Sequence, residues 1–203
     1  SGGTPSTTES SYWGGTYNWL SSGETRNYFI SITEKTITEL GIKKSSTRLA
    51  NKGDIVIASA GQGHTRGQTS YLLIDTYINQ SVISIRTNRE KVNSLWLFYN
   101  LSNRYDEMRQ MSDSHSSRGS LTTSILKTMP ISYPCLDKQQ KIALILKSLD
   151  DKIAINTKIN KTLEEIAQAI FKSWFVDFDP VYAKKNISLI ALFFIVDVMW
   201  GSI

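Results

Sequence analysis

Residues 137–175 read DKQQKIALILKSLDDKIAINTKINKTLEEIAQAIFKSWF, and this stretch without glycine or proline decides the architecture of the chain. Apolar and small residues recur along it in alternating steps of four and three, which is the heptad pattern of a coiled coil. The seam consists of Ile142, Leu146, Leu149, Ile153, Asn156, Asn160, Leu163, Ala167, Ile170 and Trp174. The pattern predicts one long helix whose apolar stripe packs against another helix.

The length of this helix limits where its stripe can be buried. With a rise of about 1.5 Å per residue, the helix would extend over roughly 58 Å, which exceeds the width of a small domain. The seam therefore needs a second helix as a partner. Asn156 and Asn160 stand at its middle, where asparagine costs stability but fixes register and orientation. A kinked helix pair inside one domain, broken near INTKIN (155–160), is the alternative interpretation.

The residues before the helix predict short strands separated by turns. KGDIVIASA (52–60) and TSYLLID (69–75) are rich in β-branched and apolar residues, and QSVISIRT (80–87) alternates apolar and polar positions. Turns are expected at Gly53-Asp54, across residues 60–70 and at residues 76–79. This spacing of strands and turns indicates a domain rich in β structure.

A helix is expected at residues 94–111, with Ser94 as its N-cap and one apolar face. That face consists of Leu97, Leu101, Tyr105 and Met108. A polar loop (112–120), a short helix or turn (121–128) and the strand-like MPISYP (129–134) follow. We therefore expect an α+β fold, with a mixed, β-rich domain at 1–136, a long coiled-coil helix at 137–178 and an apolar tail at 179–203.

The glycine-rich loop AGQGHTRGQTS (60–70) connects two expected strands. A phosphate cradle needs a helix immediately after the glycines, and no helix is expected here, so nucleotide binding is excluded. Arginine and glutamine are the residue types that read guanine and adenine edges in the major groove of DNA. The candidate contacts in this loop are Gln62, His64, Thr65, Arg66 and Gln68. A solvated hairpin loop is the alternative interpretation.

The second polar loop, SDSHSSRGS (112–120), has a similar composition and adds Ser116, Ser117 and Arg118 as candidate contacts. Its Ser-His-Ser run lacks the acid and the strained elbow of a catalytic triad. The acids of the chain are scattered, and two histidines with one cysteine make a metal site improbable. We therefore expect no catalytic residues, no metal and no cofactor.

The overall charge and the termini limit the class of protein further. A net charge of +5 permits a polyanionic partner, and a single cysteine fits a reducing cytoplasm. The N-terminus has neither the charged nor the apolar region of a signal peptide. The tail at 187–203 is apolar but contains Asp197, which is costly within a membrane. A buried terminal element or an abnormal terminus is favoured over a membrane anchor.

Several motifs together resemble one half of the DNA specificity subunit of type I restriction-modification enzymes. They are the N-terminal SGGTPST with YWGGTYNWLSSGE, the strands NKGDIVIASAGQG and YINQSVISIR, and the run LTTSILKTMPISYPCLDKQQKIALILKSLDDKIAINTKINKTLEEIAQAIFKSWFVDFDP. The resemblance covers roughly residues 1–183. The long final run, which closes on W-F-x-D-F-x-P, is the most specific part of the match.

The resemblance implies that residues 1–136 form a target-recognition domain for one half of a bipartite site in double-stranded DNA. It also implies that the long helix packs antiparallel on a counterpart and serves as a spacer between the half-sites. Methylating subunits and a translocating nuclease subunit would dock on this scaffold and carry the catalysis. A family member has two such domains and two such helices, whereas this chain has one of each.

This difference leaves three expectations open: a half-subunit that works as a homodimer or with a second half-subunit, a truncated product, or a fragment. A coiled-coil scaffold that binds partner subunits without reading DNA is the alternative function. Specific DNA binding, with a short consensus sequence, would distinguish the two functions.

Overall fold

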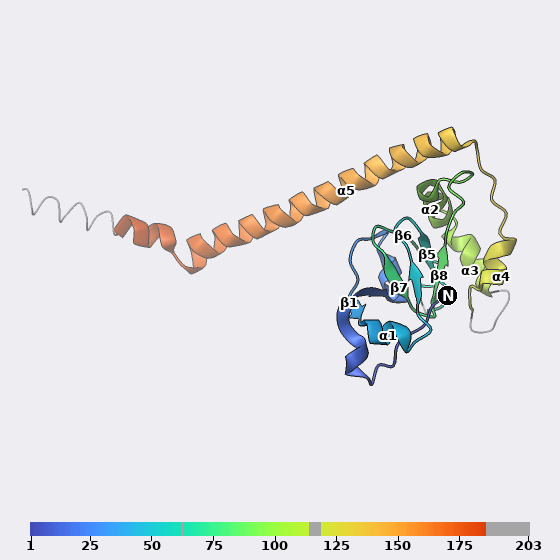
Figure 1. Ribbon diagram of the computed structural model, residues 1–203. Coiled ribbons are helices and arrows are strands. Elements are labelled where there is room, and N and C mark those ends of the chain that lie inside the picture. Colours follow the sequence, from blue (N-terminus) through green and yellow to red (C-terminus); the bar gives the residue numbers. More distant parts are fainter. Residues whose placement is uncertain (62, 114–118, 186–203) are drawn as a thin grey trace, which may run out of the picture. The chain divides into compact units, whose positions relative to one another are not determined.

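The computed structural model describes residues 1–61, 63–113 and 119–185 (Figure 1). Contacts within the chain divide it into two units, Ser1–Leu146 and the residues from Lys147 onward. The first unit contains two four-stranded sheets and several short helices, followed by the start of a long helix. The expectation of a mixed α+β domain followed by a long helix is confirmed.

The first sheet has the strand order β3-β1-β7-β4. Its strands are β1 (Trp13–Leu20), β3 (Lys35–Ile37), β4 (Arg48–Ala50) and β7 (Thr76–Ile78), with the 3-10 turn η1 (Ser10–Tyr12) before β1 and the helix α1 (Glu39–Lys43) after β3. The central pair β1 and β7 is parallel, with Trp19 opposite Tyr77, and the two outer pairs are antiparallel. Residues 76–79, expected as a turn, are thus mainly strand, because Thr76, Tyr77 and Ile78 are β-branched or aromatic.

The second sheet has the order β2-β6-β5-β8. Its strands are β2 (Phe29–Ile30), β5 (Ile55–Ala58), β6 (Thr69–Leu72) and β8 (Val82–Ile85), and the 3-10 turn η2 (Ser22–Arg26) precedes β2. The expected strands at 52–60, 69–75 and 80–87 are all confirmed, in shorter form. β5 pairs antiparallel with both β6 and β8, and β6 is parallel to β2.

The continuous apolar run of β5 is explained by burial on both of its faces. Val56 points into a cluster that also contains Leu20 of β1 and Ile78 of β7, so this cluster lies between the two sheets. Ile55 and Ile57 point the other way, into a cluster formed with the helices. A strand covered on both faces needs no polar alternation, and this accounts for its sequence.

Between the second sheet and Phe171, the described residues form four helices. They are α2 (Ser94–Ser102), α3 (Tyr105–Asp113), α4 (Thr123–Thr128) and α5 (Leu136–Phe171). The single helix expected at 94–111 is therefore wrong, because the chain breaks at Asn103 and Arg104. The break turns α3 so that Tyr105 contacts the 60–70 loop, while Met108 stays buried. The N-cap of α2 is Asn93 and not Ser94, because the Asn93 side chain accepts from the Trp96 N–H at 2.9 Å.

The short helix expected at 121–128 is confirmed as α4, but MPISYP (129–134) forms no strand. Pro130 and Pro134 lack the N–H groups that strand pairing requires, so this segment runs as an unpaired connection. It leads directly to α5.

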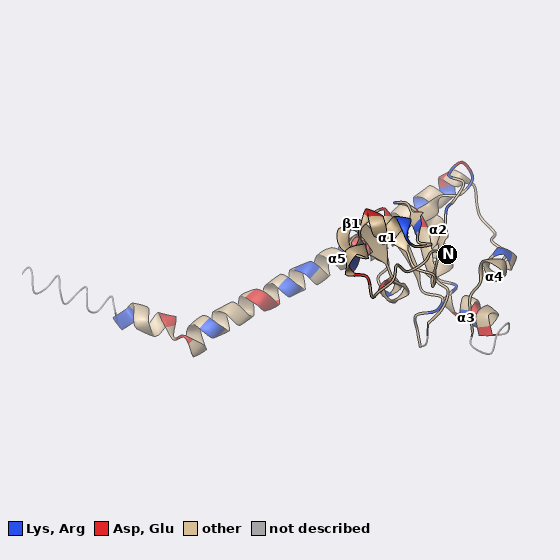
Figure 2. Cartoon of the chain, turned by 60° about the horizontal axis from the view of Figure 1, so that its bottom comes forward, with Lys and Arg blue, Asp and Glu red and all other residues tan. Residues whose placement is uncertain are grey.

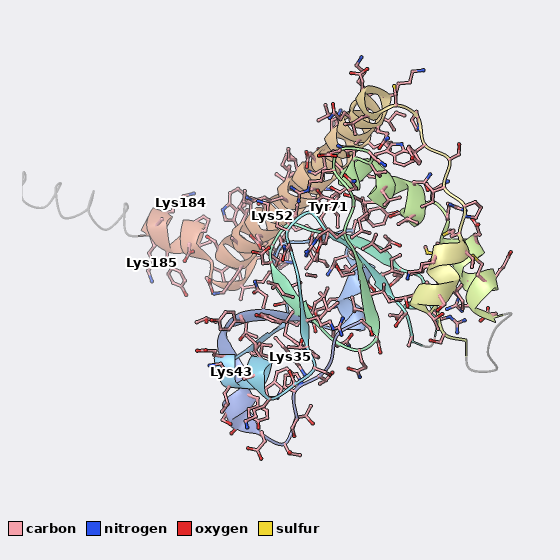
Figure 3. All side chains as sticks on the ribbon, turned by 45° about the vertical axis from the view of Figure 1, so that its right-hand side comes forward. Lys35, Lys43, Lys52, Tyr71, Lys184 and Lys185 are labelled. Carbon is pink, nitrogen blue, oxygen red and sulfur yellow. The ribbon has the colours of Figure 1, made fainter. Side chains whose placement is uncertain are left out.

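The aromatic centre of the helix-side cluster is Phe98 of α2. Its ring lies 5.6 Å from Tyr28, 5.4 Å from Phe29, 5.9 Å from Tyr71 and 5.0 Å from Tyr99, measured between ring centroids. Tyr71, labelled in Figure 3, comes from β6, and its hydroxyl is 3.2 Å from the Ser94 hydroxyl. The cluster therefore fastens α2 to the second sheet.

The first turns of α5 belong to the first unit. Gln139 is fully buried, and its side-chain oxygen accepts from the Asn93 N–H at 2.8 Å. The Gln139 amide donates to the carbonyls of Lys91 at 3.1 Å and Pro134 at 2.8 Å. Ala143 is buried one turn later. The boundary between the units therefore lies after Leu146, ten residues beyond the expected domain end at residue 136.

The long helix expected at 137–178 is confirmed for most of its length. α5 spans Leu136–Phe171 and continues into the π turn η3 (Lys172–Val176), and Phe178 then takes a positive φ of 54°. Residues 179–185 are helical again. Lysines are interspersed with Asp and Glu along α5 (Figure 2), so the helix carries no long block of one charge. The alternative of a break near residues 155–160 is wrong.

Among the helices that the structure describes, none is long and apolar enough to cross a membrane. The apolar tail at 187–203 lies outside the described residues.

Candidate nucleic-acid interface

The glycine-rich loop closes on the two strands that it joins. The Gly67 N–H donates to the Ala58 carbonyl at 2.9 Å, and the Ala58 N–H donates to the Gln68 carbonyl at 3.0 Å. Gly61, Gly63 and Gly67 all have positive φ, a conformation that is costly for residues with a Cβ atom. The prediction that these glycines permit a tight connection between two strands is confirmed.

One face of α3 holds this loop in place. The Tyr105 hydroxyl donates to the His64 carbonyl at 2.9 Å, and the Arg109 guanidinium donates to the Gly63 carbonyl at 2.8 Å. Asp113, one turn further, forms an ion pair with Arg66. The three α3 residues recur every four positions, which places them on one helix face. The loop is therefore held by its backbone, which leaves its exposed side chains available to a ligand.

Arg66 is buried, unlike the other described candidate contacts of the loop. Its side chain is 7% exposed, and its guanidinium lies against Gly119 as well as Asp113. A Cβ atom at Gly119 would lie 1.5 Å from the guanidinium, so only glycine fits there. This placement gives Arg66 the role of positioning the loop. A direct contact of Arg66 with DNA stays a prediction.

Two of the remaining described candidates, His64 and Gln68, line one hollow of about 350 Å³. It is lined by Thr25, Arg26, Tyr28, His64, Gly67, Gln68, Thr69, Ser102 and Tyr105. His64 is exposed, Gln68 is half-buried, and the Thr25 hydroxyl lies 3.5 Å from the Gln68 side-chain oxygen. Thr65, also a candidate, is half-buried beside them in the chain. The structure thus brings two of the predicted residues, His64 and Gln68, to the same hollow.

Four of the sequence-predicted contacts fall outside the described residues. They are Gln62, Ser116, Ser117 and Arg118. The flanks of the second loop are described: Asp113 and Gly119 both contact Arg66, and the Leu121 N–H donates to the Ser59 carbonyl at 2.8 Å. The two ends of that loop are thus anchored beside the first loop.

Arg26 and Tyr105 line the hollow but were not among the residues that the sequence singled out. Arg26 ends η2, which opens with a capping box in which Ser21 and Glu24 exchange hydrogen bonds. That S-x-x-E spacing is readable in the sequence and would have placed Arg26 at the end of a turn. Arg26 also pairs with Glu34 at 2.6 Å, and both side chains are well exposed. Tyr105 was expected on the apolar face of one unbroken helix, so its contact with the loop was not predicted.

Two arginine–carboxylate pairs stabilise the first unit, one at the end of β5 away from the loop and one at the start of α3. Burial raises the pKa of the Asp54 carboxyl, but hydrogen bonds from Arg86, at 3.0 and 2.8 Å, and from the Asn51 N–H outweigh it and leave that pKa lowered. Two hydrogen bonds of 2.6 Å from Arg104 lower the pKa of Glu107. Both carboxylates are thus committed to structural pairs. The described residues contain no group of three or more His, Cys, Asp and Glu side chains that could hold a metal ion.

Comparison with known proteins gives the family. The family model for the type I restriction modification DNA specificity domain matches residues 1–165. The specificity subunit of the type I restriction enzyme MjaIX from Methanocaldococcus jannaschii is 36% identical over 186 residues, which cover 88% of this chain and 41% of the relative. That of HindI from Haemophilus influenzae is 41% identical over 143 residues, which cover 66% of this chain and 30% of the relative.

Solved structures of the same kind share the fold. The HsdS subunit from Thermoanaerobacter tengcongensis has a TM-score of 0.54 at 18% identity, over 86% of this chain and 41% of that one. The S subunit of a type I restriction-modification system from M. genitalium has a TM-score of 0.57 at 17% identity, over 86% and 42%. The chain spans less than half the length of all four relatives. By the match over residues 1–165, the chain belongs to the type I restriction modification DNA specificity domain family.

Proposed function

We propose that this chain reads a short sequence of double-stranded DNA as one half of a type I specificity subunit. The observation that carries the proposal is the loop between β5 and β6 in a domain of this family. α3 fixes the loop backbone, and the loop presents His64 and Gln68 beside Arg26 around one hollow. A rigid backbone with exposed polar side chains is what sequence reading requires, because base contacts depend on geometry.

The residues divide into two expected kinds of contact. Arg26 and His64 are exposed and suit the phosphates, which set orientation and the dependence of affinity on salt. Gln68 and Thr65 suit base edges, with Gln62, Ser116, Ser117 and Arg118 as further candidates from the two loops. Arg66 would support these contacts by holding the loop in place. The chain's net charge of +5 favours a polyanionic partner.

The second part of the proposal is that α5 pairs antiparallel with an equivalent helix and separates two half-sites. The seam residues Ile153, Leu163 and Trp174 are 63%, 57% and 57% exposed, so the chain alone does not bury them. The partner is a second copy of this chain or a second half-subunit. The seam Ile142 to Trp174, interrupted by Asn156 and Asn160, would form the contact.

The complex would also contain methylating subunits and a translocating nuclease subunit, and these would carry out the reactions. The chain itself contributes target choice and spacing and needs no cofactor for either task. Its place of action would be the cytoplasm, where DNA and reduced thiols occur together.

The test is a selection from a random duplex library with the full chain and its cognate methylating subunit, followed by sequencing. We expect a short consensus that occurs twice, in inverted orientation, with a fixed gap. The His64→Ala variant should recover the same consensus at lower yield. A folded chain that enriches no sequence would overturn the proposal and leave the alternative of a scaffold that does not read DNA.

A further inference from the structure

A second and larger hollow, of about 620 Å³, lies in the first unit where α5 begins. It is lined by Tyr28, Trp96, Tyr99, Asn100, Ser102, Asn103, Arg104, Ile142 and Leu146. Its volume is in the range of pockets that bind ligands. Three aromatic side chains form its walls, and two of its lining residues, Ile142 and Leu146, are the first two positions of the helix seam. The hollow is therefore continuous with the surface that α5 would use for pairing.

Asn100 is the polar residue in this hollow whose hydrogen bonding is incomplete. Its side-chain oxygen is buried and has no hydrogen-bond partner among the described residues. A buried acceptor without a donor costs about 1–3 kcal/mol, so such groups commonly mark the place of a missing partner. Rotation of the carboxamide about its terminal bond, which exchanges the positions of its oxygen and nitrogen, would be needed to present the oxygen to a group in the hollow. In that orientation, an apolar group that carries one N–H donor would suit the hollow.

The spacing of the seam residues of α5 is symmetric, and this symmetry identifies a candidate for the apolar group with an N–H donor. The ten positions of the seam are arranged symmetrically about residue 158, so that 142 mirrors 174, 146 mirrors 170, 149 mirrors 167, 153 mirrors 163 and 156 mirrors 160. Two antiparallel copies aligned on residue 158 would therefore bring every seam position opposite another seam position. Asn156 of each copy would face Asn160 of the other, so that the polar positions pair with each other.

The same alignment pairs large seam residues with small ones. Leu149 would face Ala167, and Ile142 would face Trp174. A parallel alignment would instead place Trp174 against Trp174 and Ala167 against Ala167. This would overpack the tryptophan layer of the interface and leave a cavity in the alanine layer. The packing therefore favours the antiparallel arrangement on the residues alone.

We propose that the hollow at the start of α5 is the docking site for Trp174 of a second copy of this chain. Two positions on one uninterrupted helix cannot touch, so the Trp174 that meets Ile142 belongs to another molecule. An indole has a large apolar surface and one N–H donor that needs a partner when buried. Tyr28, Trp96 and Tyr99 would surround its ring, and Asn100 would accept from its N–H.

The position of Trp174 agrees with such a role. It lies within the π turn η3, and π turns in α-helices are frequent at functional positions. Trp174 is 57% exposed, so the chain alone does not cover it and its indole is accessible to a partner. Tryptophan is also among the residues that most often dominate the energy of an interface.

This inference rests on the helix pairing in the proposed function, and its test needs no DNA. The dissociation constant of the dimer of the full chain would be measured by sedimentation equilibrium. Trp174→Ala should raise it at least about thirtyfold, as expected for a buried tryptophan at an interface. Tyr182→Ala is the matched control, because Tyr182 is an equally exposed aromatic residue outside the seam, and should change it less than about twofold.

A double-mutant cycle tests the contact itself. Trp174→Phe keeps the ring and removes the N–H donor, and Asn100→Ala removes the acceptor. Because the symmetric dimer contains this contact twice, each should raise the dissociation constant about thirtyfold, which corresponds to two hydrogen bonds of about 1 kcal/mol each. The double variant should be no weaker than either single variant if the two groups bond to each other. Thermal melting of each variant would show that the fold is intact.

The outcomes separate this inference from the function on which it rests. Dimerisation that is insensitive to Trp174 or Asn100, or effects that simply multiply in the double variant, would overturn the docking site while the helix pairing stands. A chain that stays monomeric at high concentration would overturn both the docking site and homodimer formation. DNA reading would be unaffected by either result, because the library selection measures it separately.

Discussion

The two units of the chain differ in how completely their large apolar side chains are buried. In the first, Ile55, Ile57 and Phe98 are completely buried between the second sheet and the helices. In the second, Ile153 and Leu163 are similar in size and more than half exposed. Apolar burial contributes on the order of 2 kcal/mol per large side chain, so the first unit gains this energy within the chain and the second does not. The difference supports the proposal that another molecule covers the exposed stripe of α5.

The largest effect should come from truncating the aromatic centre of the first unit. Phe98→Ala removes a ring that contacts Tyr28, Phe29, Tyr71 and Tyr99, and should lower the free energy of unfolding by about 3–5 kcal/mol. The matched change in the second unit, Ile153→Ala, should leave the unfolding of the first unit within about 0.5 kcal/mol of wild type. Chemical denaturation followed by near-UV circular dichroism measures both. Equal losses would contradict the contrast between the units.

The next effect concerns the residue that fastens the helix to the first unit. Gln139→Ala removes three hydrogen bonds and leaves the Asn93 N–H and the carbonyls of Lys91 and Pro134 unpaired, which should cost about 3 kcal/mol. Gln140→Ala, at the neighbouring exposed position, should change stability by less than about 0.5 kcal/mol. Thermal melting of the two variants would decide. A loss of similar size in both would mean that helix propensity, and not the buried amide, sets the effect.

A pH dependence is expected in the first unit. The Asp54 carboxylate is buried and bonds to Arg86, and its pKa is lowered. A lowered folded-state pKa stabilises the fold above the unfolded value of about 3.9, and this contribution is lost as pH falls through the folded-state pKa. Asp54→Asn should therefore cost about 2 kcal/mol at neutral pH.

The direction of this pH dependence can be seen by comparing the unfolding free energies of wild type and Asp54→Asn at different pH values. The difference in unfolding free energy should shrink as pH falls from about 4 toward the folded-state pKa of Asp54, because the unfolded chain binds the proton first. It should be smallest once folded Asp54 is also protonated and resembles Asn. Urea titrations at several pH values would measure it. A difference that stays constant down to the lowest pH at which the protein folds would show that the charge of Asp54 is not what stabilises the turn.

The sequence predicted the parts of this molecule that depend on local pattern. The heptad seam predicted α5, and the β-branched runs predicted β5, β6 and β8, because periodicity and propensity act over a few neighbouring residues. The break between α2 and α3 was missed, since Asn103 and Arg104 are compatible with a helix. It is set by tertiary contacts of Tyr105 and Met108 instead. Residues 76–78 were also missed as a strand, although their β-branched and aromatic side chains favour one, because the segment has only three residues and its partners β1 and β4 are distant in sequence.

The sequence identified the loop of the candidate site, but not which of its side chains are exposed or which distant residues lie beside them. The glycines and polar residues of 60–70 identified the segment, yet nothing local showed that Arg66 would be buried or that Arg26 would lie beside Gln68. Both facts come from contacts across long sequence separations. Arg66 pairs with Asp113, 47 residues away, and Thr25 meets Gln68 across 43 residues. An arginine in a polar loop has the same local signature whether it reads a ligand or supports the loop.

The smallest effect on stability should distinguish those two roles within the loop. Arg66→Ala removes the charged contact with Asp113 and should lower the free energy of unfolding by about 1–2 kcal/mol, because the guanidinium is buried. His64→Ala should leave stability nearly unchanged, since its side chain is exposed. Both should weaken binding to the selected DNA site, but for different reasons. His64→Ala would remove a contact with DNA. Arg66→Ala would instead remove the residue that holds the loop in the position from which other side chains contact DNA.

Measurement of affinity at several salt concentrations separates these reasons. Each phosphate contact contributes about 0.9 to the slope of log affinity against log salt, so losing a contact flattens the slope. A supporting residue changes the affinity through loop geometry, and Arg66→Lys, which keeps the charge but not the planar fork, should then bind almost as poorly as Arg66→Ala. If Arg66→Lys instead restores affinity and slope together, the arginine leaves Asp113 on binding and contacts DNA directly. The loop would then be held less rigidly in the complex than in the free chain.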